Sequence, residues 1–143
     1  MAYLLSKEFK LKNIDHLELV ALAAIADLVP LTYANRALVK SGLEKLRKTK
    51  RLGLLELFNI SKIDKNTIGV YEVGHIIAPR LNAMGRLESA MDSLRLICTK
   101  NSQRARDLAQ KLSSTNLERQ KFTQEAALHA STTVASIKSS SNL

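Results

Sequence analysis

One aspartate lies at the end of an unusually apolar stretch. Asp27 follows the uncharged residues Leu19–Ala26 and precedes Leu28-Val29-Pro30. A carboxylate beside such a low-dielectric region is costly unless a cation compensates it, and the negative end of a helix dipole adds to the cost. The sequence leaves two interpretations open: an aspartate that pairs with Arg36 or stays half exposed at a helix end, or a ligand of a metal ion.

A second chemical feature is the stretch Pro79–Arg86 (PRLNAMGR). Its polar side chains are Arg80, Asn82 and Arg86. Guanidinium groups can bind phosphate oxygens with two parallel hydrogen bonds, an amide can bond a base or sugar, and a glycine permits a close turn. The alternative is an interhelical loop whose arginines pair with Glu72 and Glu88.

The charge of the chain favours a polyanionic partner. Lys and Arg number 22 against 13 Asp and Glu, for a net charge of +9, and binding of phosphates by such cations releases counterions. Much of the excess lies in one span, where a single acid, Glu44, faces seven bases: Arg36, Lys40, Lys45, Arg47, Lys48, Lys50 and Arg51. Nucleic acid is the leading partner class, and a solvated helix face followed by a basic loop is the alternative.

Helices must position these residues. With 5 glycines, 2 prolines and no sustained alternation of apolar and polar residues, the chain is predicted to be all-α. The first strong helix is expected from a cap at Asn13 or Asp15 to about Asp27, apolar on nearly every side and buried. A second helix is expected from Thr32, with Arg36, Lys40 and Arg47 outside and these residues inside: Ala34, Leu38, Leu43 and Leu46.

The second half of the chain continues this pattern. Gly53 is predicted to mark a turn, followed by a short helix at Leu54–Phe58 and a helix capped by Thr67 that reaches about His75. We then expect an irregular loop bracketed by Pro79 and Gly85. A helix at Ser89–Lys100 precedes a final one capped by Ser102. Its inner side is expected to carry small or apolar residues at three- and four-residue spacing: Ala105, Leu108, Leu112, Thr115, Phe122 and Ala126. Unbroken to Lys138, that helix is expected to have about 37 residues and a length of roughly 55 Å.

The cellular setting is expected to be reducing and cytoplasmic. The single cysteine, Cys98, lies among apolar residues and is predicted to be a small buried side chain. The chain has no membrane-length apolar run of roughly 18 residues and no signal-peptide pattern at its start.

Three motifs together resemble the RecJ family of single-strand-specific DNA exonucleases, within the DHH phosphoesterase superfamily. Glu18–Leu31 (ELVALAAIADLVPL), followed by Asn35–Arg36 and Gly42–Leu43, is similar to the family's DLVALGTVADVVPL, NR and GL. Pro79–Arg86 is similar to PRINAAGR, and Leu108–Gln120 (LAQKLSSTNLERQ) to LA..L...N.ERQ. This sequence departs from the pattern at Ala23–Ala24, where Gly-Thr is usual, and at Met84, where Ala is usual.

The resemblance implies a domain organisation and a set of site residues. Residues 1–60 would be the C-terminal, helical part of the α/β DHH domain, 61–100 a helical segment with a DNA-contacting loop, and 101–143 a long helix linking to a DHH-associated domain. Asp27 would be a catalytic ligand of Mn²⁺ or Mg²⁺. Single-stranded DNA would be contacted by Arg36, Arg80, Asn82 and Arg86. Single-strand-binding protein or helicase partners are further expectations for a complete enzyme.

The activity implied is 5′ to 3′ hydrolysis of single-stranded DNA in repair and recombination. The earlier DHH motifs have no counterpart here: Asp15-His16 has one histidine and lies too close to Asp27 in sequence. The chain alone is therefore expected to be inactive, since a nucleophilic water requires an intact metal cage. Alternatives are a catalytically dead RecJ-like helical scaffold that binds nucleic acid, and a DHH phosphodiesterase acting on nanoRNA or cyclic dinucleotides.

Overall fold

The computed structural model describes residues 16–87 and 90–140, and side chains other than those of residues 86–87 and 135–140. Within these ranges the chain is helical and contains no strand, which confirms the predicted fold class. The helices are α2 (Leu17–Ala26), α3 (Tyr33–Arg47), α4 (Leu52–Ile60), α5 (Ala78–Leu87), α6 (Met91–Cys98) and α7 (Ser102–Ser140), with a 3-10 turn, η1 (Lys65–Thr67), and a π-helical segment, η2 (Glu72–Ile77). None of these described helices has the length and apolarity needed to cross a bilayer.

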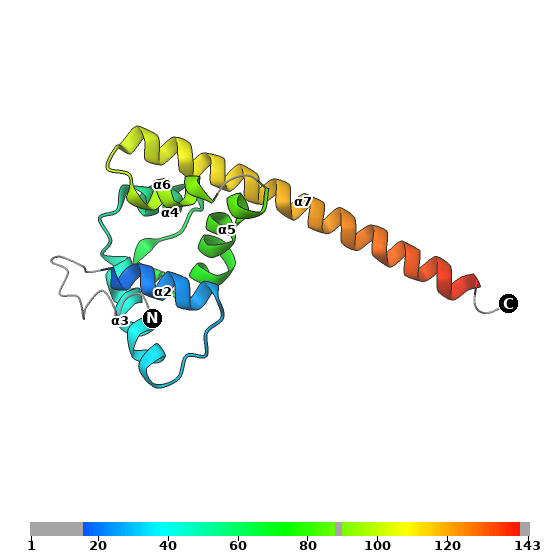
Figure 1. Ribbon diagram of the computed structural model, residues 1–143, viewed down its shortest axis with the longest axis horizontal. Helices are drawn as coiled ribbons and strands as arrows, with labels where there is room; N and C mark the ends of the chain where they lie inside the picture. Colours follow the sequence, from blue (N-terminus) through cyan, green and yellow to red (C-terminus); the bar gives the residue numbers. More distant parts are fainter. Residues whose placement is uncertain (1–15, 88–89, 141–143) are drawn as a thin grey trace.

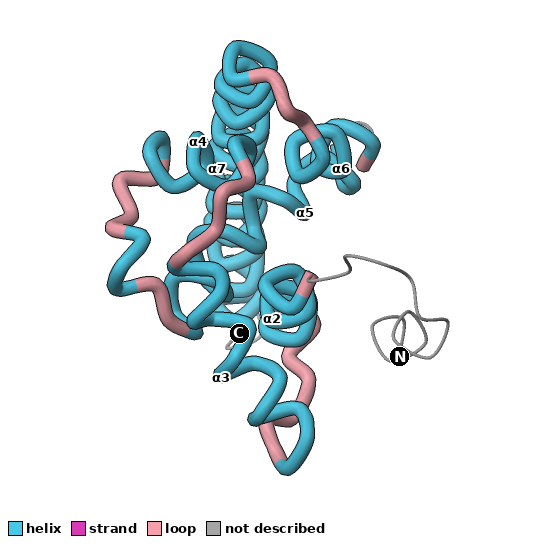
Figure 2. The backbone as a smooth tube through the Cα atoms, turned by 90° about the vertical axis from the view of Figure 1, so that its left-hand side faces the viewer, coloured by secondary structure: helices cyan, strands magenta, loops and turns pink. Residues whose placement is uncertain are grey.

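The molecule consists of a helical body and one projecting helix. α2 packs along α3, while α4, α5 and α6 surround the first half of α7. Figure 2 shows this arrangement along the direction of α7. The second half of α7 extends away from the body (Figure 1). The expected length of this helix is confirmed, because α7 has 39 residues.

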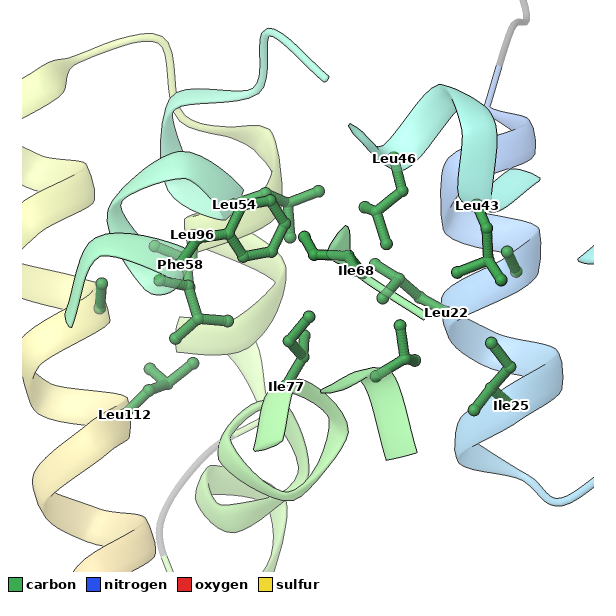
Figure 3. Packing of buried hydrophobic residues seen from close by; sticks show 14 of the residues in the cluster. Leu22, Ile25, Leu43, Leu46, Leu54, Phe58, Ile68, Ile77, Leu96 and Leu112 are labelled. Carbon is green, nitrogen blue, oxygen red and sulfur yellow. The ribbon is translucent and has the colours of Figure 1, made fainter. Parts of the chain in front are cut away.

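The core joins the two groups of helices. Leu22 of α2, Leu46 of α3 and Phe58 of α4 are buried and point toward a common centre (Figure 3). Ile68, which precedes η2, and Ile77, at its end, fill the space between them and are fully buried. Removal of this apolar surface from water is the main force that holds the helices together.

α2 is less buried than its composition predicted. Its inner face is covered by α3, but Leu19 and Ala26 are half-buried and Ala23 is exposed. The prediction of a buried helix therefore holds for the face toward α3 and the core but not for the opposite face. One apolar stripe of α2 forms the wall of a hollow instead.

α3 begins after Thr32, as predicted, and buries Leu43 and Leu46. Ala34, however, is exposed, and Arg47 turns inward to donate a hydrogen bond from Nε to the carbonyl oxygen of Ile68 at 2.9 Å. The hydrogen bond explains the error for Arg47, because it ties the end of α3 to the loop after η1.

Gly53 is not a turn residue but lies in the first turn of α4. A Cβ atom placed there would meet the carbonyl oxygen of Leu96 at 1.9 Å. The glycine therefore allows the start of α4 to lie against the backbone of α6.

Cys98, predicted to be buried, is exposed. Helix α6 packs through Ser93 and Leu96, and a residue two positions after Leu96 faces the other side of the helix.

The predicted loop between Pro79 and Gly85 is a helix. η2 runs directly into α5, so the chain is helical over residues 70–87. Proline has no N–H group to donate the hydrogen bond of a regular helical turn. The π-helical turn before Pro79 changes the hydrogen-bond pattern and thus which carbonyl groups need a donor. The helix begins next to Gly69, whose N–H donates to the Glu72 carboxylate at 2.8 Å, and Thr67 belongs to η1 rather than capping a helix.

α7 is capped one residue earlier than predicted. The side-chain oxygen of Asn101 accepts a hydrogen bond from the N–H of Arg104 at 2.9 Å. The inner face of α7 carries the buried residues Ala105, Ala109, Leu112, Thr115 and Asn116. Phe122 and Ala126, predicted to lie on the same inner face, are exposed, because the body of the protein ends before them.

Candidate metal and nucleic-acid site

Asp27 lies where α2 ends in a left-handed turn. Leu28 has φ of 53°, and the N–H groups of Leu28 and Val29 donate to the carbonyl oxygens of Ile25 and Ala24 at 3.1 and 3.0 Å. This pair of bonds is the Schellman arrangement, which usually has glycine at the left-handed position. A leucine there is strained by about 1 kcal/mol or more, and such strain is often found beside functional groups.

The carboxylate of Asp27 is exposed and forms no hydrogen bond or ion pair with another described residue. The pairing with Arg36, one alternative that the sequence left open, is therefore not made within the described chain, whereas the exposed position at the helix end agrees with the other structural alternative. The turn at Leu28 explains this, because it directs the chain away from α2 and leaves the end of the helix open.

Asp27 lines a hollow of about 400 Å³ between α2, α5 and α6, which we call the α2–α5 hollow. Ala23 and Ala26 of α2 form one wall, and Leu81 and Asn82 of α5 form another. The hollow thus brings Asp27 together with Asn82, two residues singled out from separate motifs.

Asn82 also borders a second hollow of about 190 Å³, toward α7. Ala26, Gly74 and Arg119 are among its other lining residues. Arg119 donates a hydrogen bond to the side-chain oxygen of Asn116 on the same helix at 3.3 Å. Its place beside Asn82 was not expected, although it belongs to the third family-like motif, which was the signal available in the sequence.

Arg80 does not project as a free loop arginine. Its Nη1 group donates to the carbonyl oxygen of Ile76, one turn earlier, at 2.7 Å. Its Nε atom is buried without a partner in the described chain, and burial lowers the pKa of Arg80. Arg80 does not pair with Glu72, as the alternative interpretation required, and the Glu72 carboxylate accepts a hydrogen bond from the N–H of Gly69 instead. Arg86 lies in α5, but its side chain is outside the described part, as is Glu88.

The seven bases between positions 36 and 51 do not form one open cationic surface. Arg36 and Lys40 are exposed on α3. Arg51, by contrast, pairs with the buried carboxylate of Glu18, lies 2.7 Å from Nδ1 of His16 and donates to the carbonyl oxygen of Ile97 at 3.3 Å. Arg47 and Arg51 therefore serve the fold, and the charge available to an external anion is smaller than the sequence indicated.

The described residues provide only part of a metal site. They contain no group of three or more His, Cys, Asp or Glu side chains close enough to hold an ion. Asp27 offers carboxylate oxygens, and the neighbouring Asn82 offers an amide oxygen in the same hollow. Both are hard donors suited to Mg²⁺ or Mn²⁺, but two such residues do not complete a cage.

No protein-family model matches the chain. The single-stranded-DNA-specific exonuclease RecJ of Bacillus subtilis is 45% identical over 106 residues, which are 74% of this chain and 14% of that protein. RecJ of Escherichia coli is 35% identical over 117 residues, covering 81% of this chain and 20% of that protein. The chain belongs to the RecJ family. It spans about a seventh to a fifth of the RecJ proteins it matches.

Solved RecJ structures agree with this assignment. The crystal structure of RecJ from Thermus thermophilus in complex with Mg²⁺ has a TM-score of 0.72 and 35% identity, over 87% of this chain and 20% of that one. A crystal structure of exonuclease RecJ bound to manganese has the same TM-score and identity, over 87% of this chain and 32% of that one. The helical body and long helix are therefore a part of the RecJ fold.

Proposed function

We propose that this chain is a helical portion of a metal-dependent exonuclease that hydrolyses single-stranded DNA from the 5′ end, in repair and recombination. The main observation behind the proposal is that Asp27 and Asn82 both line the α2–α5 hollow. One residue suits a metal ion and the other a nucleotide, and they come from the two motifs most similar to RecJ sequences. Activity requires the complete enzyme.

Asp27 is proposed as one ligand of Mn²⁺ or Mg²⁺, ions that solved RecJ structures contain. Its carboxylate is exposed and has no partner among the described residues, so a metal ion would not have to displace an existing ion pair. Such ions lower the pKa of a bound water and neutralise phosphate charge. The remaining ligands must come from outside the described residues.

Asn82, Arg80, Arg86 and Arg36 are proposed to contact the DNA, and the structure adds Arg119 as a candidate. Asn82 has the strongest support, because it is exposed and borders two hollows. Arg80 would act through the part of its guanidinium not bonded to Ile76. Arg36 is exposed on α3 and is available to a phosphate.

The parts of the chain are proposed to have distinct positions in the complete enzyme. Residues 1–60 belong to the end of the DHH domain, 61–100 form the DNA-contacting helical segment, and 101–143 form the helix leading to a DHH-associated domain. The exposed second half of α7 supports the last assignment, since a helix that leaves one body usually joins or braces another.

Asp27 can be tested in a chimera. The chain would replace the matching segment of T. thermophilus RecJ, and cleavage of 5′-labelled single-stranded DNA would be measured with Mn²⁺. We expect Asp27→Asn to reduce cleavage by about a thousandfold or more, because it removes an anionic ligand. Asp107→Asn is the matched control, since Asp107 is exposed on α7 and accepts a hydrogen bond from Gln103 on the same helix. Near-normal cleavage by Asp27→Asn would refute the ligand role.

A catalytically dead scaffold that binds nucleic acid is the second candidate. The lack of a three-ligand cluster among residues 16–87 and 90–140 favours it. The gene sequence upstream of Met1 separates the two: an in-frame DHH motif contradicts the scaffold, and a promoter with a ribosome site directly before Met1 contradicts the exonuclease.

A further inference from the structure

An exposed aromatic pair lies close to the candidate site. The rings of Tyr71 and His75 are stacked, with centroids 4.6 Å apart and planes inclined by 20°. Tyr71 is 64% exposed, and Nδ1 of His75 lies 3.3 Å from the carbonyl oxygen of Tyr71, which ties the imidazole to the backbone. Neither ring contributes to the buried core, so folding of the described residues does not explain the pair.

One member of the pair, His75, borders a hollow of about 260 Å³. His75 lines this hollow together with Leu28 and Val29, which directly follow Asp27. Gly74 lines the same hollow and also the one that contains Asn82 and Arg119. His75 thus lies at one end of a series of three hollows that share lining residues, the second with Asn82 and Arg119 and the third with Asn82 and Asp27.

The backbone beneath the pair is itself unusual. His75 belongs to the π-helical segment η2 (Glu72–Ile77), and Tyr71 is its N-terminal flanking residue. π-Helical turns are rare and are frequently found at functional sites. Here the segment presents two rings on one helix face, one turn apart.

We propose that Tyr71 and His75 form a stacking platform for a base of single-stranded DNA, a role that rests on the proposed function. Every base has a π-face, so an aromatic ring binds single strands without sequence preference. The hollow that His75 borders shares Gly74 with the one that contains the proposed DNA contacts Asn82 and Arg119, and the net charge of +9 complements the strand. The platform holds the strand and takes no part in bond cleavage.

The test measures binding of the chain to a fluorescent oligothymidylate and to an abasic oligonucleotide of equal length. Tyr71→Leu is expected to weaken oligothymidylate binding about tenfold and to leave abasic binding unchanged, whereas Tyr71→Phe retains affinity. Tyr33→Leu is the matched control, since Tyr33 is 94% exposed on another helix. A 2-aminopurine base should lose fluorescence on binding to the wild type and not to Tyr71→Leu.

The outcomes distinguish the platform from the proposed function. If the chain binds both oligonucleotides and Tyr71→Leu changes neither affinity, the platform is refuted and the phosphate contacts stand. If the wild-type chain binds neither oligonucleotide, the platform and the DNA contacts of this chain are both refuted. Unchanged thermal melting of Tyr71→Leu, expected for so exposed a residue, shows that the fold is intact.

Discussion

The guanidinium group of Arg51 contacts Glu18, His16 and the carbonyl oxygen of Ile97. The side chains of Arg51 and Glu18 are 24% and 11% exposed, so the pair joins the start of α2 to the start of α4 in a partly dehydrated setting.

Replacement of Arg51 by alanine should lower the free energy of unfolding by about 2–3 kcal/mol, because it leaves the Glu18 carboxylate buried without its cation. The measurement is urea unfolding followed by circular dichroism. Arg106→Ala is the control: its contact with Glu56 is 3.8 Å long and its side chain is 58% exposed, so a change of about 0.5 kcal/mol or less is expected. Equal losses in the two variants would contradict a structural role specific to Arg51.

At the scale of elements, the contact between α4 and α6 depends on Gly53. The helix start lies so close to the backbone of α6 that a methyl group would overlap the carbonyl oxygen of Leu96. A backbone atom cannot rotate away as a flexible side chain can. The two helices would have to separate, and Leu54 and Leu96, both fully buried, would lose contacts.

Gly53→Ala should therefore reduce the free energy of unfolding by about 2–4 kcal/mol, as overpacked core substitutions do at their upper range. Gly85→Ala is the contrasting variant. The Cβ atom there would have an ordinary contact at 3.7 Å, and alanine favours helix over glycine by about 1 kcal/mol. The two melting temperatures should move in opposite directions; a stable Gly53→Ala protein would show that α4 and α6 can separate at little cost.

At the scale of the whole molecule, the packed body ends before α7 does. The last strongly buried residues of this helix are Thr115 and Asn116, and the described side chains of residues 121–134 are all exposed. The projecting half thus adds length but almost no core (Figure 1). Its exposed apolar residues, Phe122 and Leu128 among them, are suited to packing against another domain.

A chain that ends at Gln120 should keep its free energy of unfolding within about 0.5 kcal/mol of the full chain, since removal of exposed terminal residues costs little. A chain that ends at Leu108 should not fold, because Ala109 and Leu112 are fully buried. Both can be followed by urea unfolding. A marked loss of stability on truncation at Gln120 would mean that the projecting half supports the body.

The sequence by itself determined the helical class, the approximate helices α2, α3, α4, α6 and α7, and the family. These follow from local periodicity and from motifs that are contiguous in the chain. The prediction from sequence was wrong where the local pattern did not decide the structure. Pro79 indicated a loop, but the π-helical turn before it allows the helix to continue.

Only the tertiary structure determined which charged side chains are available to an external partner. Arg47 and Arg51 are bound by partners 21 and 33 residues away in sequence, Ile68 and Glu18, and no pattern of nearby residues reports such contacts. The same is true of the hollow that Asp27 and Asn82 both line and of the hollow that Asn82 and Arg119 both line. Hydrogen bonds and hollows depend on where helices cross, and the crossing is set by the packing of the whole core rather than by any one motif.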